Sequence, residues 1–187
     1  HLFSYVNQPK DGSYLLIPTV SSERRRYIPL GFFDAKDIAV APNYIVPEAT
    51  LYEFGILTSE MHNDWMRTVA GRLKSDYRYS ATLVYNTFPW PEASESKRKH
   101  IEGLAEEIIL IREDYPDKTL ADLYDPDKMP VPLLEVHKTL DCAVEALYRD
   151  RPFRDASERL EHLFGRYEKL TAAEKAKAPV KKTKGSN

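Results

Sequence analysis

The chain has 187 residues, 42% of them hydrophobic and 11% aromatic, which is enough to build the core of one domain or of two small ones. Its 27 Lys and Arg against 29 Asp and Glu give a net charge of −2, which argues against a protein that grips nucleic acid by overall charge alone. The single cysteine, Cys142, excludes an internal disulfide and a cysteine-rich zinc site, and is typical of a reducing cytoplasm. No apolar run approaches the roughly 18 residues that span a bilayer, so we expect no membrane partner.

The charge is distributed unevenly along the chain. Residues 1–91 carry nine basic and nine acidic side chains, residues 92–170 carry thirteen and nineteen, and residues 171–187 carry five and one. Any contact with nucleic acid must therefore rest on local patches or on other parts of a longer protein. The chain starts at His1 and lacks the charged-then-apolar pattern of a secretory signal, so we interpret it as a piece of a longer cytoplasmic protein.

Residues 1–48 are predicted to be rich in β-strands. Short apolar runs lie at Tyr14–Val20, Tyr27–Leu30, Ile38–Val40 and Tyr44–Val46, separated by Pro, Gly, Asn and Asp. This spacing predicts a meander of short strands.

The loop after the first of these strands contains three adjacent arginines. Arg24, Arg25 and Arg26 follow two serines and a glutamate, and their forked donors could hold the phosphates of a nucleic acid. A charged turn that only keeps the protein in solution is an equally good interpretation.

The apolar period becomes helical from Ala49 onward. Hydrophobic side chains recur at three- and four-residue steps as far as Ala70, which predicts two helices. Thr58 or Ser59 can cap the second helix, and Gly71 can end it.

The stretch from Gly71 to Pro91 has the strongest functional pattern. Lys74, Asp76 and Arg78 recur at every second position, which on an extended strand places a cation, an anion and a second cation on one face. Such side chains suit the reading of base edges, because Arg or Lys pairs with guanine acceptors and a carboxylate accepts from an exocyclic amine. A solvated strand face is the alternative. Two prolines near the end of the stretch predict a stiff exit from the sheet.

Residues 92–170 are predicted to form a helical bundle. The helices are expected after a cap at Ser94 or Ser96, over Leu133–Tyr148 and over Ala156–Leu170. Residues 171–187 form a basic tail without an apolar period, which we expect to be flexible. The predicted fold class is therefore α+β, with a β-rich domain and its packed helices followed by an all-α bundle domain.

Several candidate active sites fail on inspection. His137, Asp141 and Cys142 lie close together on one predicted helix, but they make neither a closed metal site nor a nucleophile with its base. His62 has the pattern of a hydrogen-bonded structural histidine. Asn86–Trp90 superficially resembles the Asn-Pro-Pro-aromatic motif with which amino-methyltransferases hold a flipped base, but threonine and phenylalanine stand where the prolines would be. The sequence also lacks a glycine-rich cofactor loop, so we expect the chain itself to be non-catalytic, without cofactor or metal.

Four separated runs carry a resemblance to a known family. They are SSERRRYIPLGF at Ser21–Phe32, LYEFGILTSEMHNDWMRTVAGRLKSDYRYS at Leu51–Ser80, VYNTFPWP at Val84–Pro91 and LADLYDPDKMP at Leu120–Pro130. In this order they resemble the C-terminal part of the MmeI-like, type IIL restriction-modification DNA methyltransferases. In that family one long polypeptide joins a nuclease domain, a helical connector, an adenine-N6 methyltransferase domain, a target recognition domain and a C-terminal helical domain.

The resemblance implies that residues 1–91 form a DNA target recognition domain, residues 92–170 a C-terminal helical domain and residues 171–187 a flexible basic tail. It implies double-stranded DNA and the methyltransferase domain of the same polypeptide as partners. S-adenosylmethionine would be bound by that absent domain and not by this chain. The parent would methylate adenine N6, with or without endonuclease activity.

The family also implies roles for particular residues. The family's strand that matches 71–80 carries base-choosing residues, which implies this role for Lys74, Asp76 and Arg78. Contacts to phosphates or to a groove are expected from a second set: Arg24, Arg25, Arg26, Asn43, Arg72, Tyr77 and Tyr79. A different function stays open beside this one, namely a protein-interaction or scaffolding module that docks other domains of a larger enzyme.

Overall fold

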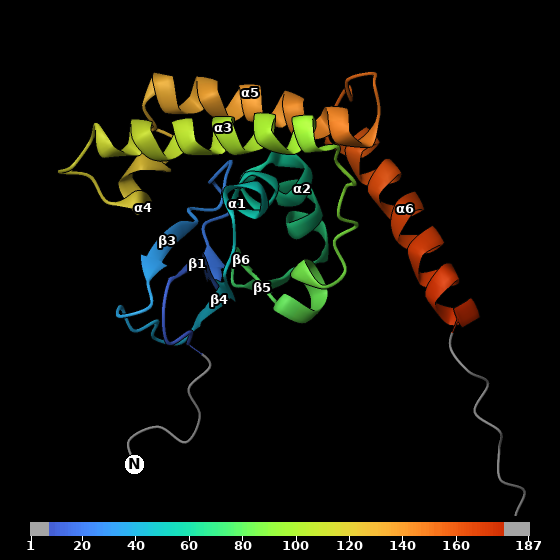
Figure 1. Ribbon diagram of the computed structural model, residues 1–187, viewed down its shortest axis with the longest axis horizontal. Helices are drawn as coiled ribbons and strands as arrows, with labels where there is room; N and C mark the ends of the chain where they lie inside the picture. The colour runs from blue at the N-terminus through green and yellow to red at the C-terminus, as the bar shows by residue number, and fades with distance from the viewer. Residues whose placement is uncertain (1–7, 178–187) are drawn as a thin grey trace, which may run out of the picture.

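A computed structural model describes residues 8–177 of the chain. Two small antiparallel sheets lie on one side of the molecule, two long helices lie on the other, and a pair of short helices lies between them (Figure 1). The strands are β1 (Ser13–Pro18), β2 (Val20–Ser21), β3 (Gly31–Asp34), β4 (Asn43–Pro47), β5 (Gly71–Leu73) and β6 (Asp76–Arg78). The helices are α1 (Leu51–Thr58), α2 (Glu60–Val69), the π-helical turn η1 (Ala81–Tyr85), α3 (Glu95–Glu113), α4 (Leu120–Leu123), α5 (Val131–Tyr148) and α6 (Ala156–Lys177). This arrangement confirms the predicted α+β class.

The first sheet has the strand order β3-β1-β4 and buries the inner side chains of β1. Leu15 lies opposite Val46 on one side and Phe32 on the other. The second sheet has the order β2-β6-β5, so a strand from residues 1–48 pairs with strands that follow α1 and α2. These antiparallel pairings agree with a β-rich first segment but not with one continuous meander.

Two of the predicted strands are wrong. The segment 27–30 is irregular, although Tyr27, Ile28 and Leu30 are buried. The Ile28 N–H donates to the side-chain Oδ1 of Asn63 (3.0 Å), so a side chain and not a neighbouring strand satisfies the backbone. Ile38 is 75% exposed in an irregular loop, which explains why its run does not form a core strand.

The stretch that starts at Gly71 is a hairpin and not one long strand. Leu73 lies opposite Asp76, so Lys74 and Ser75 form a two-residue turn, with Lys74 at a φ of 57°. Tight hairpin turns need such left-handed residues, and Asn-Gly or Asp-Gly is their usual sequence signal. Lysine gives no such signal, which is why alternation alone suggested an uninterrupted strand. After β6 the chain coils into η1, so the predicted exit also begins earlier than expected.

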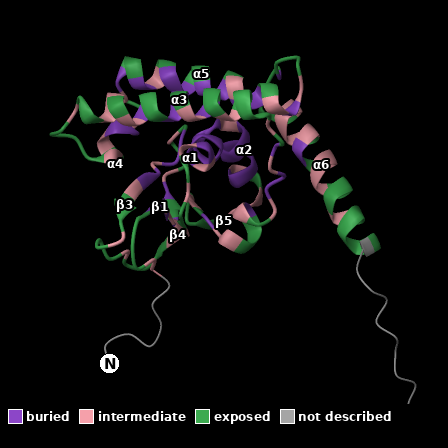
Figure 2. Ribbon diagram, in the orientation of Figure 1, coloured by how far each residue is buried: buried purple, intermediate pink, exposed green. Residues whose placement is uncertain are grey.

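The predicted helices of residues 49–70 are confirmed. Thr50 and Glu53 form a capping box at the start of α1, where each satisfies a backbone N–H of the other. Ser59 stands at the N-cap position of α2, but its hydroxyl donates to the Ile56 carbonyl oxygen (2.7 Å) and makes no capping bond. The helix ends at Val69, two residues before the glycine that was expected to end it. Nearly all residues of α1 and the first six after Glu60 in α2 are buried (Figure 2).

Helix α1 packs closely on α3 and joins the two halves of the chain into one hydrophobic core. The core extends from Leu15 in β1 to Leu163 in α6. A Cβ built on Gly55 would lie 2.6 Å from the Cγ2 of Ile101, so glycine allows the two helices to approach.

Replacing Gly55 with alanine is expected to destabilise the chain by about 1–2 kcal/mol net, because the strain of displacing Ile101 exceeds the gain in helix propensity. Gly103→Ala is the matched control on α3, since a Cβ there meets no atom of the described residues within 4 Å. This control should stabilise the helix by about 0.5–1 kcal/mol. Urea unfolding of both variants measures the difference, and a stabilised Gly55→Ala protein would contradict the close packing.

The helical segment follows its prediction closely at the start and less closely at the end. The side chain of Ser94 accepts a hydrogen bond from the Lys97 N–H and caps α3, as expected. Helix α6 continues to Lys177, so the part of the expected flexible tail from Thr171 onward is helical as far as that residue. The rest of that tail, residues 178–187, lies outside the described residues. Across residues 8–177, none of the helices is both long enough and apolar enough to cross a membrane.

Candidate nucleic-acid interface

The β5–β6 hairpin presents an exposed, charged surface. Asp76 and Arg78 share one face of β6, and Lys74 stands at the turn that precedes them. Lys74 and Arg78 are exposed and Asp76 is half-buried. The structure thus brings the three predicted base-reading residues together on one hairpin, with Lys74 at its tip and not on the strand face.

The opposite face of the hairpin is held by an arginine. Arg72 lies opposite Tyr77, and its guanidinium stacks over that ring at 3.9 Å. The same guanidinium donates to the Ser75 carbonyl oxygen (2.8 Å) and lies 3.6 Å from the Glu23 carboxylate. Asp76 accepts a hydrogen bond from the Glu23 N–H (3.4 Å). Arg72 and Tyr77 therefore support the turn, so the structure gives them a role besides any contact with DNA.

Tyr79 is not available for a groove contact. It is 3% exposed, and its hydroxyl lies 3.1 Å from His62 Nε2. His62 Nδ1 lies 2.8 Å from the Leu57 carbonyl oxygen, which can only accept, so Nδ1 carries the proton and Nε2 accepts from Tyr79. Burial lowers the pKa of His62 to about 4, which keeps this tautomer neutral. The prediction for Tyr79 is wrong because the strand has ended and its side chain turns into the core.

The three adjacent arginines already have partners within the protein. Arg24 pairs with Asp127 (2.6 Å), Arg25 donates to the Ala121 carbonyl oxygen (3.5 Å) and Arg26 pairs with Glu60 (2.7 Å). The side chain of Arg24 is 63% exposed, and an exposed ion pair of this kind contributes little to stability. The loop therefore does not present three free cations side by side, and only Arg24 keeps most of its surface open to a phosphate.

Asn43 lies near the end of the hairpin although it belongs to the other sheet. It is the first residue of β4, is exposed, and donates from Nδ2 to the Val40 carbonyl oxygen (2.8 Å). The ring of the next residue, Tyr44, lies 6.2 Å from the ring of Tyr79, which follows β6. This contact places the Asn43 loop beside the Arg78 end of the hairpin.

A buried group of acidic and basic side chains between α2, α5 and α6 was not predicted. Arg159 on α6 contacts Asp64 (2.7 Å), Glu145 (3.0 Å) and Glu60 (3.2 Å), and its side chain is 11% exposed. Asp64 also pairs with Arg67 (2.8 Å). The spacing of Asp64 and Arg67 on α2 indicates an ion pair one turn apart, but the partner on α6 has no signal in the sequence. These five side chains, the buried ionic cluster, join α2 to α5 and α6.

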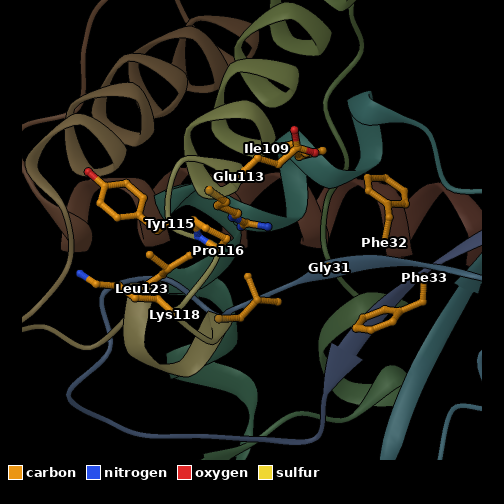
Figure 3. Close-up of a pocket in the computed structure, with 11 residues that line it drawn as sticks. Gly31, Phe32, Phe33, Ile109, Glu113, Tyr115, Pro116, Lys118 and Leu123 are labelled. Carbon is orange, nitrogen blue, oxygen red and sulfur yellow. The ribbon is translucent and has the colours of Figure 1, made fainter.

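A shallow pocket of about 290 Å³ lies on another part of the surface, between β3, the end of α3 and α4 (Figure 3). Phe32 and Phe33 line one side, and Tyr115, Pro116 and Leu123 line the other. The cation of Lys118 lies 5.1 Å from the Tyr115 ring. The pocket walls are mainly apolar and aromatic, which suits packing against a hydrophobic group more than acid–base chemistry.

Comparisons with known proteins agree with the resemblance seen in the sequence. Residues 1–92 match the domain family described as MmeI, target recognition domain, and residues 93–174 match MmeI, C-terminal domain. This chain belongs to the MmeI family. "DNA methyltransferase A" of Bacillus subtilis (strain 168) is 46% identical over 157 residues, which are 84% of this chain and 18% of that protein.

A solved structure of the Type IIL restriction-modification enzyme MmeI in complex with DNA is also similar. It is 48% identical with a TM-score of 0.86, over 90% of this chain and 22% of that one. The chain therefore spans about a fifth of the length of each relative. The MmeI family assigns the hairpin to the target recognition domain and the helices from α3 onward to the C-terminal domain.

Proposed function

We propose that this chain is the sequence-specific duplex DNA recognition module of a longer DNA methyltransferase, with the β5–β6 hairpin as its reading element. The match of residues 1–92 to the MmeI target recognition domain supports the role, as does the similarity to MmeI, whose structure is in complex with DNA. The observation that carries the proposal is the hairpin itself. Its two outer cations, Lys74 and Arg78, are exposed and Asp76 between them is half-buried, while Arg72, Tyr77 and Glu23 support the turn from the other side.

The chemistry of the hairpin suits base edges in the major groove. Lys74 and Arg78 can donate to guanine O6 and N7, and Asp76 can accept from the exocyclic amine of cytosine. A two-stranded ribbon also fits the width of that groove. Arg24 and Asn43, on the flanking loops, would add contacts to phosphate or groove. Residues of mixed sign recognise a pattern of donors and acceptors, so the near-neutral charge of the chain is compatible with this role.

Methyl transfer belongs to another domain in this proposal. The partner would be the methyltransferase domain of the same cytoplasmic polypeptide, which would bind S-adenosylmethionine and act on adenine N6. The glycines of the described residues stand singly and form no glycine-rich nucleotide loop, so we assign no step of methyl transfer to this chain. A docking module for other domains is the alternative function, and the mainly apolar pocket beside α4 favours it.

The recognition role is tested by altering Asp76 and Arg78 in the full-length enzyme. Asp76→Asn or Arg78→Ala is expected to relax the methylated motif at one position by about tenfold to a hundredfold, since a good base contact contributes roughly 1–3 kcal/mol of discrimination. Methylome sequencing of cells that express each variant measures the motif. Lys138→Ala, an exposed cation on α5, is the control and should leave every position unchanged. An unaltered motif in both hairpin variants would favour the docking function.

A further inference from the structure

The loop 22–26, which we call the arginine loop, lies between the hairpin and the C-terminal helices. On one side it contacts the hairpin, because the Glu23 N–H donates to Asp76 Oδ1 and the Glu23 carboxylate lies 3.6 Å from Arg72. It also continues β2, whose Ser21 is paired with Tyr77 of β6. Strand β2 has only two residues, so the position of this sheet edge depends on the loop that follows it.

On its other side the arginine loop is held by Arg67 of α2. The guanidinium of Arg67 donates to the backbone carbonyl oxygens of Arg25 (3.4 Å) and of Arg26. A planar guanidinium that bonds two successive carbonyls fixes the direction of that backbone segment. The guanidinium of Arg67 also donates to Asp64 on the same helix (2.8 Å). This bond fixes the direction in which the Arg67 side chain points toward the loop.

The buried ionic cluster extends this support into the C-terminal domain. The second carboxylate oxygen of Asp64 accepts from Arg159 Nε of α6 (2.7 Å), and Arg159 is held in turn by Glu145 of α5 (3.0 Å). Asp64 and Arg159 are nearly buried, with side chains 7% and 11% exposed. Charges at this depth keep their geometry because an unpaired one is costly. A continuous series of contacts therefore runs from α5 and α6 through α2 and the arginine loop to Asp76.

We propose that Arg67 is a positioning residue for base recognition, through which the C-terminal helices set the placement of Asp76 and the β5–β6 hairpin. This inference rests on the recognition function proposed above. It assigns the C-terminal domain a part in sequence discrimination although its helices carry none of the reading residues. A recognition group must be held to within a fraction of an ångström by its support, so a loosened loop weakens discrimination before it weakens binding.

The test uses Arg67→Lys in the full-length enzyme. The variant keeps a cation near Asp64 but has a single nitrogen, whereas Arg67 bonds Asp64 through Nη1 and both carbonyl oxygens through Nη2. Methylation rates are measured on the cognate duplex and on duplexes with each motif position substituted singly. Their ratio is the discrimination at each position. Because both rates come from one preparation, partial unfolding cancels in the ratio. Asp76→Asn and Arg78→Ala define which positions the hairpin reads.

At those positions Arg67→Lys is expected to lower discrimination by about fivefold to twentyfold, and elsewhere to change it by less than about twofold. Arg98→Lys is the matched control, because Arg98 also pairs with a carboxylate, that of Glu53 (3.8 Å), and makes no contact with the arginine loop. Unchanged discrimination, or an equal loss at every position, would overturn the positioning role. If Asp76→Asn and Arg78→Ala alter no position, the recognition function fails and this inference fails with it.

Discussion

Replacement of Arg159 with leucine is expected to destabilise the chain by about 3–5 kcal/mol, since it removes the shared cation from a buried group of carboxylates. Glu60, Asp64 and Glu145 would then face one another with side chains only 17%, 7% and 11% exposed. Leucine fills part of the space but carries no charge. Within residues 8–177, Glu145 then has no ion-pair partner, and Asp64 and Glu60 keep only Arg67 and Arg26. Urea unfolding followed by circular dichroism measures the loss.

The matched control is Arg154→Leu, just before the same helix. Arg154 also contacts a glutamate, Glu158 (3.4 Å), but its side chain is 80% exposed. Its removal should therefore change the free energy of unfolding by less than about 0.5 kcal/mol. Equal effects of the two substitutions would mean that Arg159 is no more than a surface ion pair.

The helices of this fold could be predicted because their signals are local. Thr50 with Glu53 and Ser94 before Lys97 are capping patterns that can be recognised in the sequence. The spacing of the apolar residues then predicts how far each helix extends. The end of α6 was missed because alanine and lysine continue a helix as readily as a tail. The composition of this segment shows that it is exposed to solvent, but it does not show whether the segment is a helix or a coil.

The reading surface could be predicted only in part. The charged residues were found from alternation, which is the same for one strand and for a hairpin whose turn lacks glycine. The burial of Tyr79 depends on His62, and the support of Asp76 depends on Glu23, 53 residues away. Arg159 and Asp64 are 95 residues apart. Contacts at such separations follow from the packed core and leave no periodic signal in the sequence.

Asp141 on α5 gives the chain a second buried carboxylate with a different environment. It is 6% exposed, accepts from the Tyr27 hydroxyl (2.6 Å) and from the Glu60 N–H (2.7 Å), and has no guanidinium in direct contact among the described residues. Burial raises the pKa of the Asp141 carboxyl to about 7, although both hydrogen bonds act to lower it. In the folded protein this carboxyl is therefore mainly neutral below about pH 7.

The pH dependence of stability should report this carboxyl directly. Its pKa is higher in the folded chain than its ordinary value near 4, so its favourable contribution is complete below about pH 4, is lost as the pH rises, and is gone above about 7. Asp141→Asn keeps an acceptor for Glu60 and resembles the neutral acid at every pH. Relative to the original chain the variant should gain stability between pH 5 and pH 8, on the order of 2–3 kcal/mol.

The comparison of the two proteins removes a competing effect. Burial also lowers the pKa of His62 to about 4 and holds that of His137 well below its usual range, so both histidines favour the fold above about pH 6.5 and cost stability as the pH falls. The two proteins share these histidines, so their contribution cancels in the difference. Urea unfolding at pH 5, 6, 7 and 8 measures it. A difference that stays constant with pH would mean that Asp141 is ionised throughout, held as an anion by Tyr27 and the Glu60 N–H.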